Sequence, residues 1–216
     1  MIKAVIFDMD GLLIDSEPFW REAETIAFQT VGITPTTDDF NRTMGHRISE
    51  VVEYYYHQQP WEGASHKDLE ALVIDKVIEL VKEKGELLPG VHQVFDICEQ
   101  AGLPMAIASS SYDDVINAVV DATNIRHYFK HIYSAEHEPY GKPHPGVYIT
   151  AAGLLGVSPT QCLAFEDSPN GVLAAKAAKM YCVAVPEPEV KSHKFIQTAD
   201  VILDSLEDFD PDVFSR

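Results

Sequence analysis

The pattern of hydrophobic and polar positions changes twice along the chain. Four apolar residues at positions 4–7 lead into Asp8 and Asp10, and such a short apolar run is typical of a buried strand. Apolar residues then recur at helical spacing, which predicts helices and no strand from residue 16 to residue 85. The sequence predicts the helices at residues 16–32, 49–59 and 65–84.

From residue 87 onward, short strands and helices alternate. The sequence predicts strands at residues 104–108, 131–134, 162–165, 181–185 and 200–202, and helices at residues 91–101, 113–122, 145–155 and 169–179. This alternation is typical of a doubly wound parallel sheet. We therefore expect an α/β fold: a Rossmann-like doubly wound core of residues 1–14 and 86–216, with an inserted α-helical cap domain at residues 15–85.

The charge of the chain narrows the classes of partner. With 34 acidic and 16 basic residues, the formal net charge is −18, which opposes binding to nucleic acid and to acidic membrane surfaces. The apolar runs are strand-sized, well short of the roughly 20 residues of a membrane span, and no signal-peptide pattern is present at the start. We expect a monomeric cytoplasmic protein that binds neither nucleic acid nor membrane and acts on a small molecule.

The two aspartates after the first predicted strand are candidates for chemistry. Side chains alternate along a strand, so Asp8 and Asp10 lean to the same side. Two carboxylates about 4 Å apart repel each other by roughly 4 kcal/mol at an effective dielectric constant near 20, unless a cation joins them. The alternative is a solvated Asp-x-Asp-Gly turn.

Two other predicted strand ends carry polar groups suited to an anion. Ser109 begins a run of three serines before a helix, where a hydroxyl and free amides can bind phosphate or can simply cap the helix. Lys142 stands between Gly141 and Pro143 in a loop that proline makes stiff, although a lone surface lysine is usually solvated.

A fourth strand end returns to carboxylates. Glu166 and Asp167 follow an apolar run and precede a helix that we expect Ser168 to cap. Because ligands of open α/β sheets bind beyond the carboxyl ends of the strands, Asp167 should face the same crevice as Asp8. The four strand ends together supply oxygen ligands for Mg²⁺, and a cation with hydroxyl and amide donors for a phosphoryl group.

These four strand ends, in this order, resemble the four motifs of the haloacid dehalogenase-like superfamily of phosphohydrolases. The matching residues are Asp8-Met9-Asp10-Gly11, Ser109, Lys142 and Glu166-Asp167. The helical segment after the first motif resembles that family's cap of the first type. Within the family, the segments at residues 15–18, 59–61, 87–91 and 141–145 are most similar to members that act on hexose or hexitol phosphates, such as 2-deoxyglucose 6-phosphate.

The resemblance implies a role for each matched residue. Asp8 is implied as the nucleophile, which forms an aspartyl-phosphate, and Asp10 as the acid and then the base. The hydroxyl of Ser109, the amide of Ser110 and the ammonium of Lys142 are implied to bind the phosphoryl group.

The resemblance also implies a Mg²⁺ cofactor, for which Mn²⁺ can substitute. Its ligands are implied to be the carboxylates of Asp8 and Asp167 and the backbone carbonyl of Asp10, with Glu166 binding through water.

Substrate choice should lie in the cap. Glu17 and Arg47 are our candidates for contacts with the sugar, and the alternative for Arg47 is a solvated charge at a helix start. We interpret Trp20 as packing within the cap rather than as a platform for the sugar.

Three other activities fit parts of the pattern. A sugar-phosphate mutase of the β-phosphoglucomutase type shares these motifs, but it has a cap histidine where this chain has Trp20, and Lys-Asn where this chain has Tyr112-Asp113. A non-catalytic phosphate or metal sensor does not require a nucleophile paired with an acid. Haloacid dehalogenation requires neither the acid Asp10 nor metal carboxylates, because a halide leaving group needs no proton.

Overall fold

Six parallel strands form the centre of the computed structural model, which describes residues 1–215. The strands lie in the order β3-β2-β1-β4-β5-β6, and every neighbouring pair is parallel. Their bounds are β1 Ala4–Phe7, β2 Met105–Ser109, β3 Phe129–Ser134, β4 Cys162–Glu166, β5 Tyr181–Ala184 and β6 Val201–Ile202. The prediction of a doubly wound parallel sheet is confirmed.

Eight α-helices accompany the sheet within the described residues. They are α1 Glu17–Gln29, α2 Thr37–Thr43, α3 Ile48–Gln58, α4 His66–Lys84, α5 Val91–Gln100, α6 Asp113–Ala122, α7 Gly146–Leu155 and α8 Pro169–Ala177. Short 3-10 helices lie at Arg126–Tyr128, Ala135–His137, Pro159–Gln161, Ile196–Thr198, Leu206–Asp208 and Pro211–Ser215. No helix within residues 1–215 combines the length and the apolar composition needed to cross a bilayer.

The alternation of side chains along β1 divides the core into two layers. Val5 and Phe7 belong to a cluster with residues of α5 and α6, such as Phe95, whereas Ala4 and Ile6 belong to a cluster with residues of α7 and α8. All four β1 residues are fully buried. This burial on both faces explains why the strand appears in the sequence as a continuous apolar run.

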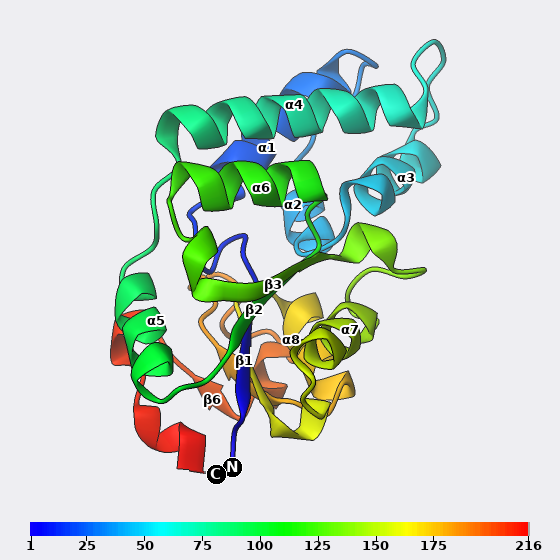
Figure 1. The fold of residues 1–216 in the computed structure, drawn as a ribbon. Helices are drawn as coiled ribbons and strands as arrows, with labels where there is room; N and C mark the ends of the chain where they lie inside the picture. Colours follow the sequence, from blue (N-terminus) through cyan, green and yellow to red (C-terminus); the bar gives the residue numbers. More distant parts are fainter. Residues whose placement is uncertain (216) are drawn as a thin grey trace.

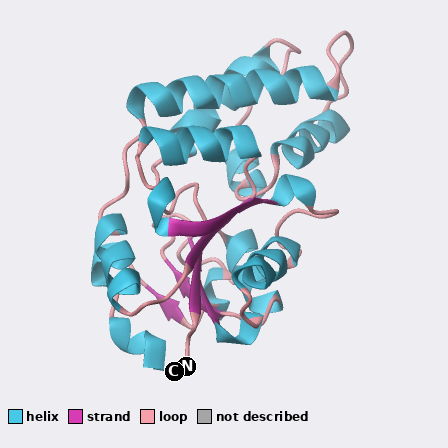
Figure 2. Cartoon of the chain, viewed as in Figure 1, coloured by secondary structure: helices cyan, strands magenta, loops and turns pink. Residues whose placement is uncertain are grey.

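The helices α1 to α4 lie beyond the carboxyl edge of the sheet. Figure 2 shows all the strands at one end of the molecule and helices alone at the other. The chain enters and leaves this helical insertion through two adjacent segments, where Ile14 forms an isolated bridge with Leu87. In Figure 1, α4 runs across the top of the insertion, above α1 and α6, and it packs against both of these helices.

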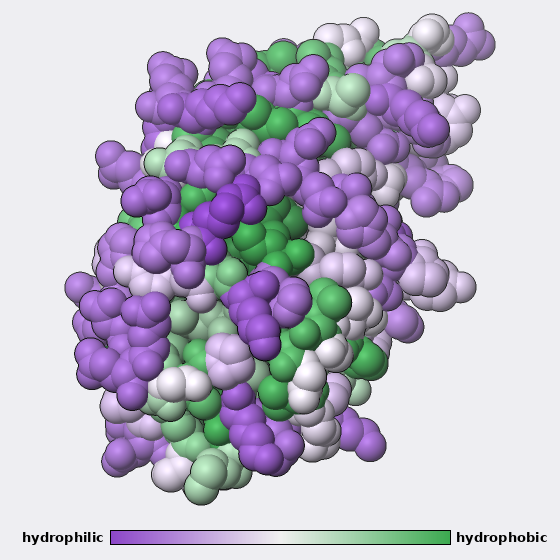
Figure 3. Space-filling view, viewed as in Figure 1, coloured by the Kyte–Doolittle hydropathy of each residue, from purple (hydrophilic) through white to green (hydrophobic). Residues whose placement is uncertain are grey.

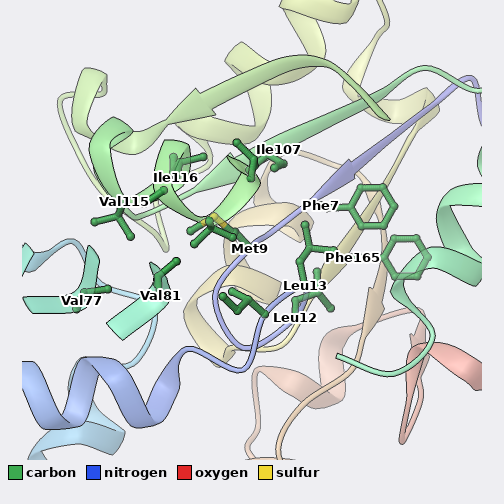
Figure 4. Close-up of a cluster of buried hydrophobic side chains, with 14 of the residues drawn as sticks. Phe7, Met9, Leu12, Leu13, Val77, Val81, Ile107, Val115, Ile116 and Phe165 are labelled. Carbon is green, nitrogen blue, oxygen red and sulfur yellow. The ribbon is translucent and has the colours of Figure 1, made fainter. Parts of the chain in front are cut away.

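Apolar side chains connect the sheet to the insertion without a break. Met9, Leu12 and Leu13, in the turn after β1, are buried in one cluster with Val77 and Val81 of α4. Figure 4 shows these turn residues between the sheet and α4. Hydrophilic side chains, in contrast, cover most of the outer surface of the insertion in the view of Figure 3. The insertion is therefore anchored through the segment that also carries the first two aspartates.

Two local features differ from the sequence-based expectation. The helix α2 was not predicted, because its only buried residue is Thr43 and it therefore has no apolar stripe. Its start is nevertheless encoded by a capping box between Thr36 and Asp39. Ser16 precedes α1 as expected but makes no capping hydrogen bond, because its hydroxyl donates to Asp10 instead.

Candidate active site

Asp8 and Asp167 meet where the strand order reverses. The central strand β1 is followed in the chain by β2 and β3 on one side and by β4 on the other, which makes the β1/β4 boundary the topological switch point. Phe7 pairs with Phe165 in register, and the Asp8 amide donates to the Phe165 carbonyl at 3.0 Å. The first residues after the two strands therefore lie side by side.

A buried lysine joins the two acidic strand ends. The Lys142 ammonium lies 2.8 Å from Asp8 Oδ1 and 2.7 Å from Glu166 Oε1, and its side chain is 1% exposed. The ammonium also lies 5.1 Å from the centroid of the Tyr148 ring. The structure thus brings the predicted Lys142 into contact with the candidate nucleophile.

Glu166 is occupied by protein donors on both of its oxygens. Oε1 accepts from Lys142 and from the Tyr148 hydroxyl at 2.5 Å, and Oε2 accepts from the amides of Asp167 and Ser168. The carboxylate is fully buried. Glu166 therefore orients Lys142. The sequence does not reveal this role, because no local pattern on α7 indicates that Tyr148 would bond to Glu166.

Burial controls the electrostatics of this group. It raises the pKa of Asp8 to about 7, with a further increase from Glu166 and Asp10, while Lys142 acts in the opposite direction. Burial raises the pKa of Asp167 well above its ordinary value, and the neighbouring Asp8 and Glu166 raise it further. Burial lowers the pKa of Lys142, but Asp8 and Glu166 outweigh this and leave it raised. The single positive charge of Lys142 thus faces three carboxyl groups in this site.

The same carboxylates fit a divalent cation. Asp8, Glu166 and Asp167 each offer an oxygen, and these oxygens all lie within 4.8 Å of one another. Oδ1 of Asp167 is buried and has no hydrogen-bond partner among residues 1–215. A Cβ atom at position 11 would stand only 2.4 Å from Asp167 Oδ2, so Gly11 leaves the space beside this carboxylate open. Hard oxygen donors with an unsatisfied negative charge suit Mg²⁺.

Asp10 accepts four side-chain hydrogen bonds from two parts of the molecule. Oδ1 accepts from the Ser16 hydroxyl at 2.7 Å and from the Trp20 indole N–H at 2.9 Å. Oδ2 accepts from the hydroxyls of Ser111 at 2.7 Å and Ser109 at 3.3 Å. The carboxylate is therefore fixed between the sheet edge and the start of α1.

Three of these four donors, Ser16, Trp20 and Ser111, were not predicted to contact Asp10. Trp20 was interpreted as packing, yet its indole N–H contacts Asp10; its position four residues after Ser16 puts both on one face of α1. Ser111 was noted only as part of the serine run. Ser109 itself accepts from the Ser111 amide at 3.0 Å and does not cap α6, whose N-cap residue is Tyr112.

The cap is closed onto the core by direct hydrogen bonds. The Ser110 hydroxyl donates to the Gly45 carbonyl at 2.8 Å, so the structure brings the predicted Ser110 to the cap loop. The amide group of Asn170 donates to the Met44 carbonyl and contacts His46 Nε2 at 3.1 Å. These contacts connect the loop after β2 and the first turn of α8 with the loop between α2 and α3.

Arg47 bridges the cap and the core. Its guanidinium donates to the carbonyls of Ala135 and Glu138 and pairs with Glu50 at 2.8 Å, and Glu50 in turn accepts from the Gly141 amide. Arg47 is absent from the cavity between cap and core, so in this closed state it does not contact the space expected to receive the sugar.

A cavity lies between these two halves. Its walls include Asp8, Asp10 and Asp167 on the sheet side, and Glu17 on the cap side. Burial raises the pKa of Glu17 to about 7, and the nearby Asp10 raises it further. Glu17, the predicted sugar contact, therefore lies beside the candidate catalytic carboxylates, at the N-terminus of α1. Ser109 and Lys142 are not among the residues that line this cavity, but they contact Asp10 and Asp8, which do.

Comparisons with known proteins agree with this geometry. Residues 2–179 match the family model described as haloacid dehalogenase-like hydrolase. The chain is 43% identical to hexitol phosphatase B of Escherichia coli K12 over 206 residues, which cover 95% of this chain and 93% of that protein. It is 32% identical to a probable pseudouridine-5'-phosphatase of Drosophila melanogaster, covering 97% of this chain and 92% of that one.

The fold is also similar to that of a solved structure. CbbY from Rhodobacter sphaeroides, in complex with phosphate, superposes with a TM-score of 0.88 at 26% identity, and the match covers 96% of each chain. The likeness extends over both the sheet and the helical insertion, because nearly the whole of each chain is included.

Proposed function

The chain belongs to the haloacid dehalogenase-like hydrolases and is a phosphatase, and we propose that it hydrolyses phosphate monoesters of hexoses or hexitols. The observation that carries this proposal is the buried Asp8, paired with Lys142 and facing the same cavity as Asp10. A nucleophile, a cation and a proton carrier thus meet within one enclosed site. The relative named hexitol phosphatase B supports the choice of substrate class.

We assign the first step of the reaction to Asp8. Its carboxylate oxygen forms a bond to phosphorus while the bond from phosphorus to the sugar oxygen breaks, giving an aspartyl-phosphate. Lys142 and the Ser110 amide neutralise the charge on the phosphoryl oxygens, and Ser109 supports the same loop. Water then attacks phosphorus, inorganic phosphate leaves, and Asp8 is restored.

Asp10 carries the proton in both steps. It donates a proton to the departing sugar oxygen and then takes one from the attacking water. The Trp20 N–H can only donate, so Oδ1 is reserved as an acceptor. The hydroxyls of Ser109 and Ser111 can also accept, which leaves Oδ2 free to carry the proton.

The residues suited to a cation are Asp8 and Asp167, with the backbone carbonyl of Asp10. Mg²⁺, or Mn²⁺ in its place, supplies positive charge that offsets the repulsion between these carboxylates and the substrate phosphate. Because Glu166 is saturated by protein donors, we place it outside the direct ligands.

A panel of phosphorylated sugars tests this function. We expect release of inorganic phosphate from hexose or hexitol phosphates with Mg²⁺, and loss of the activity when EDTA removes the metal. Conversion of β-glucose 1-phosphate to the 6-phosphate without phosphate release would instead indicate a mutase. The Trp20 contact to Asp10 favours hydrolysis, because a histidine stands at this cap position in the mutase pattern.

A further inference from the structure

One carboxyl group in the cap has no partner in the protein. Glu24 is 6% exposed, and its Oε2 is buried without a hydrogen-bond partner. No hydrogen bond or ion pair within residues 1–215 involves the Glu24 side chain, and the Nε atom of the neighbouring Arg21 is buried without a hydrogen bond, 4.0 Å from Glu17 Oε2. A buried carboxyl without donors or acceptors is costly, so its presence calls for an explanation.

Glu24 lines the same cavity as the catalytic carboxylates. Glu17, Trp20, Arg21 and Glu24 follow each other at helical spacing, and all four line the cavity between cap and core. At 1.5 Å per residue, Glu24 lies about 6 Å beyond Trp20 along the axis of α1. Because Trp20 contacts Asp10, which faces the leaving oxygen, Glu24 stands further along the path of the leaving group.

The elements α2 and α3 and the loop between them add four apolar residues to the cavity wall: Phe40, Met44, Ile48 and Val51. The same elements also contribute Thr43 and His46, which are polar. Burial and, to a smaller extent, the nearby Glu17 raise the pKa of Glu24 to about 8, although Arg21 acts in the opposite direction.

We propose that Glu24 is a specificity-determining residue, which hydrogen-bonds hydroxyl groups of the leaving polyol at the end distant from the phosphate. The inference rests on the proposed phosphatase function and names a residue that selects the substrate. A carboxyl bonds to hydroxyls in either protonation state, because a hydroxyl both donates and accepts. An analogue that lacks the matching hydroxyl would leave the buried carboxyl unpaired and would therefore bind less well. Such a hydrogen bond discriminates between substrates more strongly than an apolar contact does.

A pair of substrates, compared across variants, tests this contact. Sorbitol 6-phosphate and n-hexyl phosphate both have six-carbon chains, and n-hexyl phosphate lacks every hydroxyl of the polyol, including those that Glu24 is proposed to bind. The measurement is the ratio of their kcat/KM values in the wild type, in Glu24→Leu, in Glu24→Gln and in Glu22→Leu. Glu22 is the control, because it lies on the same helix but is exposed to solvent.

We expect Glu24→Leu to reduce the preference for sorbitol 6-phosphate at least tenfold, since a hydrogen bond to a charged or buried group is lost. Glu24→Gln keeps a donor and an acceptor and should retain a larger part of the preference than Glu24→Leu. Glu22→Leu should leave the ratio unchanged. Glu24→Leu should also raise Tm by several degrees, because it removes an unpaired buried carboxyl, whereas loss of a structural contact would lower Tm.

The outcomes separate this inference from the function on which it rests. If the wild type releases no phosphate from any polyol phosphate, the proposed function itself fails. If the wild type is active but the ratio in Glu24→Leu stays within twofold of the wild-type value, Glu24 does not select the polyol. A fall in Tm without a change in the ratio would assign Glu24 a purely structural role and would likewise overturn the inference.

Discussion

The two sides of the cavity differ in how their charged groups are satisfied. On the sheet side, Asp10 accepts four hydrogen bonds, and Lys142 and Glu166 are bonded to each other and to further protein groups. The exception there is Asp167 Oδ1, which has no hydrogen bond within residues 1–215 and faces the proposed cation site. On the cap side, Glu24 makes no hydrogen bond or ion pair within residues 1–215, and the Nε atom of Arg21 is buried without a hydrogen bond, 4.0 Å from Glu17 Oε2. The sheet side is thus preorganised for chemistry that is the same for every substrate, whereas the cap side keeps its polar groups free for the part of the substrate that varies.

The largest effect is expected from the sheet side, at the nucleophile. Asp8→Asn removes the attacking oxygen charge while keeping the side-chain shape, and kcat should fall by about 10³-fold or more. Phosphate release from a sugar phosphate measures the loss, and circular dichroism checks that the variant is folded. Turnover within tenfold of the wild type would show that another group attacks phosphorus.

Removal of the buried cation should strongly destabilise the sheet side. Lys142→Met leaves Asp8 and Glu166 buried without their shared partner, and the free energy of unfolding should fall by about 3–5 kcal/mol. Lys176 is the control, because its ion pair with Asp200 is partly exposed, and Lys176→Met should cost about 1 kcal/mol or less. Denaturant unfolding of both variants makes the comparison, and equal losses would contradict it.

The cap side should also respond to pH, through Glu24. Because the pKa of Glu24 is raised from 4.5 to about 8 in the folded state, the folded protein retains a proton that the unfolded chain releases. The contribution of Glu24 to the unfolding free energy of the wild type is therefore lost as pH rises from about 4.5 to about 8.

Glu24→Gln removes this loss of stability. Its advantage in unfolding free energy over the wild type should grow across this window, by about 2–4 kcal/mol. Denaturant unfolding at several pH values measures the difference, with Glu22→Gln as the control that should show none. An advantage that is constant with pH would mean that Glu24 does not titrate in this window.

A smaller effect is expected where the two sides meet. Trp20→Phe removes the indole N–H that fixes Asp10, and kcat should fall about tenfold with a change in its pH profile. Trp61 donates to the Ala64 carbonyl within the cap, so Trp61→Phe should leave kcat unchanged. If the two substitutions lower kcat equally, the effect comes from cap stability and not from Asp10.

The smallest effect concerns closure of the cap. A Cβ atom at position 141 would stand 2.6 Å from Glu50 Oε2 and 2.9 Å from Arg47 Nε, so Gly141→Ala should oppose the closed state. Because these side chains can shift, we expect kcat/KM to fall only about threefold to tenfold. Gly153→Ala is the control, since open space surrounds that position on α7. Steady-state kinetics of both variants test this, and an unchanged Gly141→Ala would argue against tight closure here.

The sequence predicted the sheet side better than the cap side. The helix pattern predicted α6 at its observed bounds. The alternation of strands and helices along the chain implies a parallel sheet, and a parallel sheet of this kind has a switch point where ligands bind. The strand ends bring Asp8 and Asp167 together because β1 and β4 are neighbours, whereas Lys142 reaches Asp8 from the loop between β3 and α7. The fold class could therefore be derived before any contact was known.

The partners of the site residues could not be derived in the same way. Tyr148 contacts Glu166 from a helix that is apolar in sequence, and Trp20 was assigned to packing because indole rings usually pack. Arg47 was expected at the sugar, whereas its guanidinium contacts carbonyls of the core in the closed structure. Glu24 has the ordinary appearance of a polar helix residue. Its burial depends on how α1 docks onto α2 and α3, which no local pattern encodes.

The stereochemistry of the reaction at phosphorus tests the central claim most directly. A substrate whose phosphoryl group is made chiral with oxygen isotopes and sulfur is hydrolysed, and the configuration of the product is compared with that of the substrate. Attack by Asp8 followed by attack of water inverts phosphorus twice, so the account predicts net retention. Net inversion would show that water attacks the substrate directly and would contradict an aspartyl-phosphate at Asp8.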